Sequence, residues 1–241
     1  MEHISYPGPI HDFLNRIEQT RSGKDPAPAP RILDCGAGGE TPPLGLFFAH
    51  GFETQGIDIS DEQITNAREF AKRHAMKLKI QKGDMRRIPF GDESFDYVYE
   101  YHSMCHLTKA DNRIAIQEMM RVLKKGGLCF LGFMGIESWP ILGRKVGDNE
   151  FRLMEGPQEV VHSAYADGEP DAYFTDWKVI QIEKITRWWK NWSTQLSMED
   201  WMGWYDEERT QFTRAEWEGM YADRIARGNS THIFYIVQKP E

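Results

Sequence analysis

Residues 31–40 read RILDCGAGGE, an apolar run that ends in an acid and then gives way to glycines. Glycine accepts positive φ angles and carries no side chain, so Gly36, Gly38 and Gly39 permit a tight turn against which a ligand can lie. A turn of this kind occurs in many nucleotide-binding proteins and also in ordinary loops. Its meaning therefore depends on the segments that follow it.

The composition is that of a globular protein with one substantial core. The chain has 241 residues, of which 40% are hydrophobic and 27% charged. No apolar run reaches the roughly 20 residues that span a bilayer, and the N-terminus lacks a secretory pattern. Three separated cysteines predict neither disulfides nor a zinc site, so we expect a cytoplasmic protein without a metal. The net charge of −8 argues against nucleic acid or anionic membranes as partners.

Strand and helix patterns alternate along the chain, which predicts an α/β fold with a doubly wound parallel sheet. Apolar runs predict strands over 32–35, 54–59, 78–82, 95–101 and 128–133. One-sided apolar spacing and capping residues predict four helices. Two lie over 11–21 and 44–50, and a third begins after its cap Ser60. The fourth lies over 108–123, with Gly126 and Gly127 as its stop signal. Further on, strands are predicted over 177–188 and 231–238, with two capped helices between them, at Ser197-x-x-Asp200 and Thr213-x-x-Glu216.

Acidic residues lie at the carboxyl ends of the first four strands, where an open parallel sheet binds its ligands. They are Asp34, Asp58, Asp84 and Glu100. Carboxylates at a buried sheet edge are costly unless something pairs with them. A ligand with a cationic amine, ribose hydroxyls and an adenine amine would supply such partners. Asp58 lies 22 residues after Gly36 (58 − 36), the spacing at which an acid reaches ribose hydroxyls in dinucleotide folds.

With these motifs, residues 30–135 resemble a class I S-adenosylmethionine-dependent methyltransferase, of the methyltransferase-domain 11/25 type that acts on small molecules. The matching segments are the glycine motif, Gly56–Ser60, Gly83–Met85, Phe95–Val98 leading into Glu100, and Glu118–Gly127. The resemblance implies one Rossmann-like domain over 1–241, with seven mostly parallel strands and an antiparallel last strand. Residues 1–30 would form an N-terminal helix and linker, 31–135 the cofactor-binding core, and 136–176 and 193–227 helical lid insertions over the substrate.

The resemblance also implies a set of cofactor contacts for S-adenosylmethionine and its product S-adenosylhomocysteine. The glycine turn would line the methionine part and the ribose, Asp58 would hold the ribose hydroxyls, and Asp84 would accept from the adenine amine. The full set is Asp34, Cys35, Gly36, Ala37, Gly38, Asp58, Ile59, Gly83, Asp84, Met85 and Tyr101. Within this set Cys35 is interpreted as a packing residue rather than a nucleophile. Glu40 replaces a glycine of the family motif, which leaves the geometry there open.

Glu100 and His102, at the end of the fourth strand, are candidates for removing a proton from a methyl acceptor. His102 has an ordinary pKa near the working range and Glu100 precedes it. His106, four residues further on, is favoured as a structural residue. Tryptophans gather in the C-terminal part and would suit an apolar or aromatic acceptor if the insertions form a lid.

The predicted function is methyl transfer from S-adenosylmethionine to a small-molecule acceptor, whose identity the sequence leaves open. A first alternative is an NAD(P)-dependent oxidoreductase, but Thr41 stands where its fingerprint requires glycine. A second alternative is a non-catalytic methyltransferase-like binding module, which the acids at the strand ends disfavour.

Overall fold

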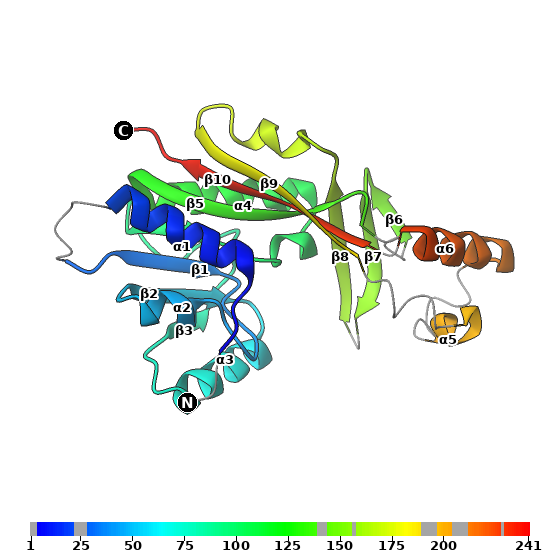
Figure 1. Cartoon of the computed structure of the whole chain (residues 1–241), viewed down its shortest axis with the longest axis horizontal. Helices are drawn as coiled ribbons and strands as arrows, with labels where there is room; N and C mark the ends of the chain where they lie inside the picture. Colours follow the sequence, from blue (N-terminus) through cyan, green and yellow to red (C-terminus); the bar gives the residue numbers. More distant parts are fainter. Residues whose placement is uncertain are drawn as a thin grey trace.

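The centre of the structure is a sheet in which strands far apart in the sequence lie side by side (Figure 1). The computed structural model describes residues 4–21, 28–138, 144–155, 158–188, 197–203, 212–227 and 229–241. The sheet has ten strands among the described residues, three more than predicted, and seven of them lie in the order β3-β2-β1-β4-β5-β10-β9. They are β1 (Arg31–Cys35), β2 (Glu53–Asp58), β3 (Lys79–Lys82), β4 (Phe95–Tyr99), β5 (Leu123–Gly135), β9 (Lys178–Trp188) and β10 (Asn229–Gln238).

Strand directions confirm the predicted doubly wound sheet with an antiparallel last strand. The first five strands pair in parallel, and β10 runs antiparallel to both of its neighbours, β5 and β9. Parallel strands need crossover connections, which place helices on both faces of the sheet. The carboxyl ends of β1 to β4 therefore meet along one edge.

Helices cover the two faces with separate apolar layers. On one face lie α1 (Gly8–Arg21), α2 (Leu44–Ala49) and α3 (Asp61–Arg73), which bury side chains such as Phe13 and Phe47 against the sheet. On the other face lies α4 (Lys109–Val122), which buries side chains such as Met119. No helix among the described residues is long and apolar enough to cross a bilayer.

The ends of α3 and α4 test the capping predictions. Ser60 accepts a hydrogen bond from Gln63 N, and Thr108 accepts one from Asp111 N, as predicted. The C-terminus of α4 was predicted too late, because the helix ends at Val122 and Leu123 already belongs to β5. Gly126, at φ +70°, donates its N–H to Lys239 O, so this glycine lies at an irregular start of β5 rather than at a helix end.

In its described residues the insertion over 136–176 consists mainly of strands, so the prediction of a helical segment there is wrong. β6 (Arg144–Gly147), β7 (Glu150–Glu155) and β8 (Gln158–Tyr165) form an antiparallel unit, followed by the short 3-10 helix η2 (Glu169–Tyr173). β8 extends the main sheet through only two residue pairs with β5, Met134 with Ala164 and Gly135 with Tyr165. Another 3-10 helix, η1 (Met104–His106), follows β4.

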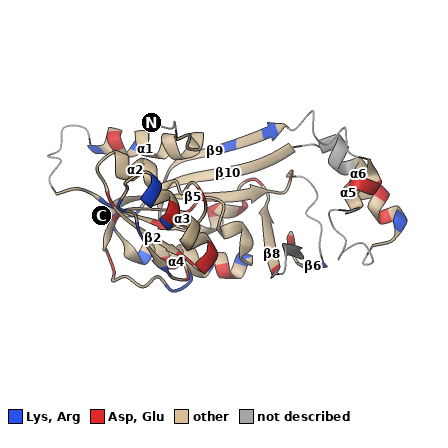
Figure 2. Ribbon diagram, turned by 90° about the horizontal axis from the view of Figure 1, so that it is seen from below, with Lys and Arg blue, Asp and Glu red and all other residues tan. Residues whose placement is uncertain are grey.

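The second insertion lies at the far end of the β9–β10 ribbon. Figures 1 and 2 both show α5 (Met198–Gly203) and α6 (Arg214–Arg227) beyond β6, away from the α1–α3 layer. Both predicted caps are present, since Ser197 Oγ accepts from Asp200 N and Thr213 Oγ1 accepts from Glu216 N. Trp217 is buried in a small cluster of its own between these helices, while Trp189, Trp192 and Trp204 lie outside the described residues.

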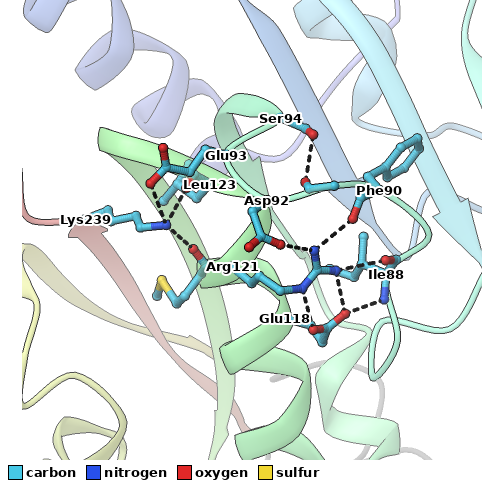
Figure 3. Close-up of polar contacts among 11 residues, drawn as sticks. Ile88, Phe90, Asp92, Glu93, Ser94, Glu118, Arg121, Leu123 and Lys239 are labelled. Carbon is cyan, nitrogen blue, oxygen red and sulfur yellow. Dashed lines mark hydrogen bonds and ion pairs between the residues drawn. The ribbon is translucent and has the colours of Figure 1, made fainter.

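A polar network fixes the loop between β3 and β4 (Figure 3). The Arg121 guanidinium contacts Glu118 at 2.7 Å and Asp92 at 2.8 Å, and it donates to the carbonyl oxygens of Ile88 and Phe90. Bidentate and forked contacts of this kind use the geometry of arginine fully. The loop held in this way also carries Asp84 and Met85.

Candidate functional site

A cavity of about 840 Å³ opens at the carboxyl ends of the parallel strands. This is the edge at which open α/β sheets bind ligands. One half is lined by the predicted cofactor residues, and the other by the loop after β4 and the β7–β8 hairpin. Of the predicted cofactor residues, the following line it: Gly36, Gly38, Asp58, Ile59, Gly83, Asp84, Met85 and Tyr101.

The glycine turn brings backbone to the cavity wall. Gly36 has φ +119°, and a Cβ there would lie 1.9 Å from Ser103 Oγ. A Cβ on Gly38 would lie 2.5 Å from Asp58 Oδ2. Any side chain at either position would therefore displace a neighbouring element, which explains why the turn requires glycine here.

Asp58 is held by the turn and by the start of α3. Its Oδ2 accepts from Gly38 N and its Oδ1 from Ser60 N, both at 2.9 Å. Since a carboxylate oxygen has two lone pairs, each oxygen keeps one acceptor position for a ligand hydroxyl. Ile59 follows with 62% of its surface exposed, an unusual exposure for isoleucine, and presents an apolar surface to the cavity.

Three of the predicted cofactor residues lie beneath the turn and do not line the cavity. Asp34 and Cys35 are buried because β1 has neighbours on both sides and layers on both faces, and Ala37 is buried in the apolar cluster beneath the turn. Asp34 accepts a hydrogen bond from Tyr99 OH at 2.5 Å. Burial raises the pKa of Asp34 to about 8, with further contributions from the nearby Asp58 and Glu100 carboxylates.

Glu100 also lies behind the cavity wall rather than on it. The residue is fully buried, and its carboxylate accepts from the backbone N–H groups of Gly132, Ser103 and Met104. Burial raises its pKa to about 7, although these hydrogen bonds oppose the shift. This geometry favours a role in holding the loop after β4 and gives no support to Glu100 as a base.

His102 lies on the wall of the second half, in a backbone conformation with φ +61°. Its ring packs edge-on between Tyr101, at 4.0 Å, and His232 of β10, at 4.2 Å between ring centroids. Burial lowers the pKa of His102 to about 3, and His232 and Arg187 contribute to the shift. The imidazole is therefore neutral near pH 7.

Sequence reasoning missed the residues that complete the second half. From the η1 segment and the start of α4 come Ser103, His106, Leu107, Thr108 and Asp111, and from the β7–β8 hairpin come Arg152, Glu159, Val160 and Val161. Val160 and Val161 are β-branched and indicated a strand, but no local pattern could predict that this strand, β8, pairs with β5. His106 also lines the cavity, with its ring centroid 4.8 Å from that of His162. No described residue of α5 or α6 lines the cavity.

The described residues contain no group of three or more histidine, cysteine or acidic side chains that could hold a metal ion. None of the three cysteines forms a disulfide, and Cys35 and Cys129 are buried.

Comparisons with known proteins agree with this geometry. A family model described as a methyltransferase domain matches residues 33–131. The chain is 32% identical over 131 residues to 24-methylenesterol C-methyltransferase 2 of Oryza sativa subsp. japonica, covering 52% of this chain and 35% of that protein. It is 27% identical over 173 residues to the 27-O-demethylrifamycin SV methyltransferase of Amycolatopsis mediterranei, covering 68% of this chain and 63% of that protein.

A solved structure shares the fold over nearly its full length. A SAM-dependent methyltransferase from Methanosarcina mazei superposes with a TM-score of 0.63 at 19% identity, covering 98% of this chain and 99% of that one. By contrast, the chain spans about a third, or less, of the length of the sterol methyltransferases that it matches.

Proposed function

We propose that the chain is a class I S-adenosylmethionine-dependent methyltransferase, which transfers a methyl group from S-adenosylmethionine to a small-molecule acceptor; the matching family model, the relatives and the shared fold support this. The observation that carries this proposal is the division of one cavity into two halves. The half at the glycine turn has the features of a cofactor site. The half bounded by η1 and the β7–β8 hairpin is available for the acceptor.

The residues of the first half fit the cofactor. Backbone at Gly36 and Gly38 leaves room for its methionine and ribose parts, and Asp58 retains one acceptor position on each oxygen for the two ribose hydroxyls. Ile59 and Met85 offer apolar surfaces for the adenine ring. S-adenosylmethionine, when bound, supplies a methyl group that is activated by its positively charged sulfur. The main task of the protein is then to align the acceptor and exclude water.

The second half supports a small organic acceptor. Leu107, Val160 and Val161 give it apolar surface, and the Arg152–Glu159 pair, at 3.1 Å, gives it a polar margin. The names of two relatives, which specify a sterol and a rifamycin derivative, support acceptors of this kind. We propose a cytoplasmic location as well, supported by three cysteines that form no disulfide, which suits a reducing compartment.

The role proposed for His102 is to accept a hydrogen bond from the nucleophilic atom of the acceptor. Because its imidazole is neutral, one ring nitrogen is available as an acceptor, but its lowered pKa of about 3 means that it holds a transferred proton weakly. The proton is released to solvent after transfer.

Substituting His102→Gly tests this role without backbone strain, since glycine tolerates the φ of +61° at this position. We expect kcat to fall about tenfold, at or below the usual range for acid–base groups because His102 is a weak base. Affinity for S-adenosylhomocysteine, measured by calorimetry, should not change. In the parent protein, kcat should show no histidine inflection between pH 5 and 8. An inflection that disappears in His102→Gly would contradict the role of a weak, neutral acceptor.

Cofactor binding is tested by Asp58→Asn, which removes the charge but keeps one oxygen at the site. We expect affinity for S-adenosylhomocysteine to fall about 30-fold, because charged hydrogen bonds contribute more than neutral ones. The matched control is Asp61→Asn, which removes the same charge three residues away, where the side chain is 75% exposed. Titration calorimetry on both variants gives the comparison.

Two outcomes of this titration would contradict the assignment. Equal affinities for the two variants would show that Asp58 does not hold the ribose. Tight binding of NADH by the parent, with no response to S-adenosylhomocysteine, would instead favour an oxidoreductase. A methyl-transfer screen over phenols, amines, thiols and acids then identifies the acceptor.

A further inference from the structure

Arg86 connects the two halves of the cavity and was not singled out by the sequence. Its Nη2 donates to Asp84 Oδ2 at 2.7 Å, and its Nε lies 3.0 and 3.1 Å from the two oxygens of Asp84. Its Nη1 lies 3.3 Å from Asp111 Oδ2 in the first turn of α4. All three residues line the cavity, so this pair of contacts bridges the β3–β4 loop and α4 within the cavity wall.

The hydrogen bonds to Asp84 leave little acceptor capacity unused. Oδ1 accepts from Arg86 N at 2.8 Å and from Arg86 Nε, so both of its lone pairs are engaged. Oδ2 accepts from Nη2, with a longer shared contact to Nε. One acceptor position therefore remains on Oδ2, and the Arg86 contacts fix which oxygen carries it.

The ionised form of Asp84 is also maintained by this contact. Hydrogen bonds from Arg86 lower the pKa of Asp84, and Asp84 in turn raises the pKa of Arg86. An ionised carboxylate only accepts hydrogen bonds, so the open position on Oδ2 suits a donor and repels a carbonyl oxygen. A ligand that presents an N–H group at this point is favoured over one that presents C=O.

We propose that Arg86 is a positioning residue for adenine, which holds Asp84 so that its one open acceptor position selects a purine with an exocyclic amine. The inference rests on the proposed function, because it assumes that the adenosyl group occupies the first half of the cavity. It goes further in assigning base selectivity to the Asp84–Arg86–Asp111 contacts. Arginine suits this task because its planar fork engages both oxygens of one carboxylate.

The chain offers a matched control at the next residue. Arg87 is exposed and does not line the cavity, and its N–H donates to Asp84 O without involving its side chain. Arg86→Gln and Arg87→Gln thus make the same change in charge at adjacent positions. A difference between the two variants is therefore due to the contacts of Arg86, because the change in net charge is the same in both.

The experiment compares S-adenosylhomocysteine with S-inosylhomocysteine, in which a carbonyl replaces the exocyclic amine. Dissociation constants are measured by titration calorimetry for the parent, Arg86→Gln and Arg87→Gln, with melting temperatures as a check of folding. We expect the parent and Arg87→Gln to prefer the adenosyl ligand by at least about tenfold, since a site built to accept a hydrogen bond discriminates strongly. In Arg86→Gln this preference should fall several-fold, through weaker binding of the adenosyl ligand.

The readout is the ratio of the two affinities, which a merely structural role of Arg86 would not change. An equal loss for both ligands, or a ratio in Arg86→Gln equal to that in Arg87→Gln, overturns the inference while leaving the proposed function intact. Failure of the parent to bind either ligand overturns the proposed function and the inference with it. If Arg86→Gln does not fold, Arg86→Lys serves instead, because one ammonium cannot engage both oxygens in the same fork, and the same ratio decides.

Discussion

Replacement of Glu100 by alanine is expected to lower the free energy of unfolding by about 4 kcal/mol, the sum of several buried donors left without a partner. The three donors are the N–H groups of Gly132, Ser103 and Met104, which all lie within 3.1 Å of this carboxylate. Glu100 is fully buried, so the three N–H groups that lose its carboxylate are not exposed to solvent water. Urea denaturation followed by tryptophan fluorescence measures the change.

Two further variants make the result specific to these hydrogen bonds. Glu69→Ala removes an exposed glutamate from α3 and should change stability by less than about 0.5 kcal/mol. Glu100→Gln keeps the shape but turns an amide N–H₂ towards a backbone donor, so an intermediate loss is expected. A loss for Glu100→Ala no greater than that for Glu69→Ala would contradict the structural role and reopen its assignment as a base.

The contrast between Glu100 and Asp58 shows how far the sequence can predict the site. Both are acids at the carboxyl end of a strand, and the sequence predicts that both face the ligand, Asp58 at the ribose and Glu100 as a candidate base. Asp58 meets that expectation because the glycine turn and α3, both local, direct it to the cavity. Glu100 does not, because its partners include Gly132, 32 residues away on β5. Local patterns locate strand ends, but only tertiary contacts decide which side chains face a ligand.

The same reasoning explains which parts of the fold were predictable. Apolar periodicity located seven of the ten strands of the sheet, since each must bury its own side chains. The β7–β8 wall of the cavity was not predictable, because β8 joins β5 through two residue pairs about 30 positions apart. That connection has no signature in either segment alone.

The second large effect concerns pH, and its source is the pair of buried acids near the glycine turn. The pKa of Asp34 is about 8 and that of Glu100 about 7, both above their values in an unfolded chain. Between the pKa values of the unfolded chain and those of the native state, the native protein therefore binds more protons than the unfolded protein. The resulting stability is fully present below about pH 4 and is lost as pH rises through the folded pKa values.

Two histidines act in the opposite direction at lower pH. The pKa of His102 is lowered to about 3 and that of His232 to about 4, so their contribution is lost as pH falls below about 6.5. The effect of the acids is thus isolated between about pH 6.5 and 8. Across that window the free protein should lose about 2–3 kcal/mol, at up to about 1.4 kcal/mol per pH unit for each proton.

A cationic ligand should recover this loss. Among the hydrogen bonds and ion pairs of the described residues, the Asp34 side chain has Tyr99 as its partner and no basic residue. The cationic α-ammonium group, which S-adenosylhomocysteine shares with S-adenosylmethionine, would lower the pKa of both acids, so binding would release protons and tighten as pH rises. We therefore expect the shift in melting temperature caused by S-adenosylhomocysteine to grow from pH 6.5 to 8, with affinity rising up to about tenfold per unit.

The variant Asp34→Asn isolates the contribution of Asp34 to the pH dependence of stability and of ligand binding. Asparagine keeps an acceptor for Tyr99 OH but cannot ionise, so the decline in stability above pH 6.5 should become shallower. Proton release on binding, measured by calorimetry in two buffers of different ionisation enthalpy, should fall in the same variant. Since Glu100 remains, a residual slope below about pH 7 is expected. If the pH profiles of the parent and Asp34→Asn coincide from pH 6.5 to 8, the buried acid beneath the turn does not couple to the ligand, and the charge that a cofactor brings must be balanced elsewhere.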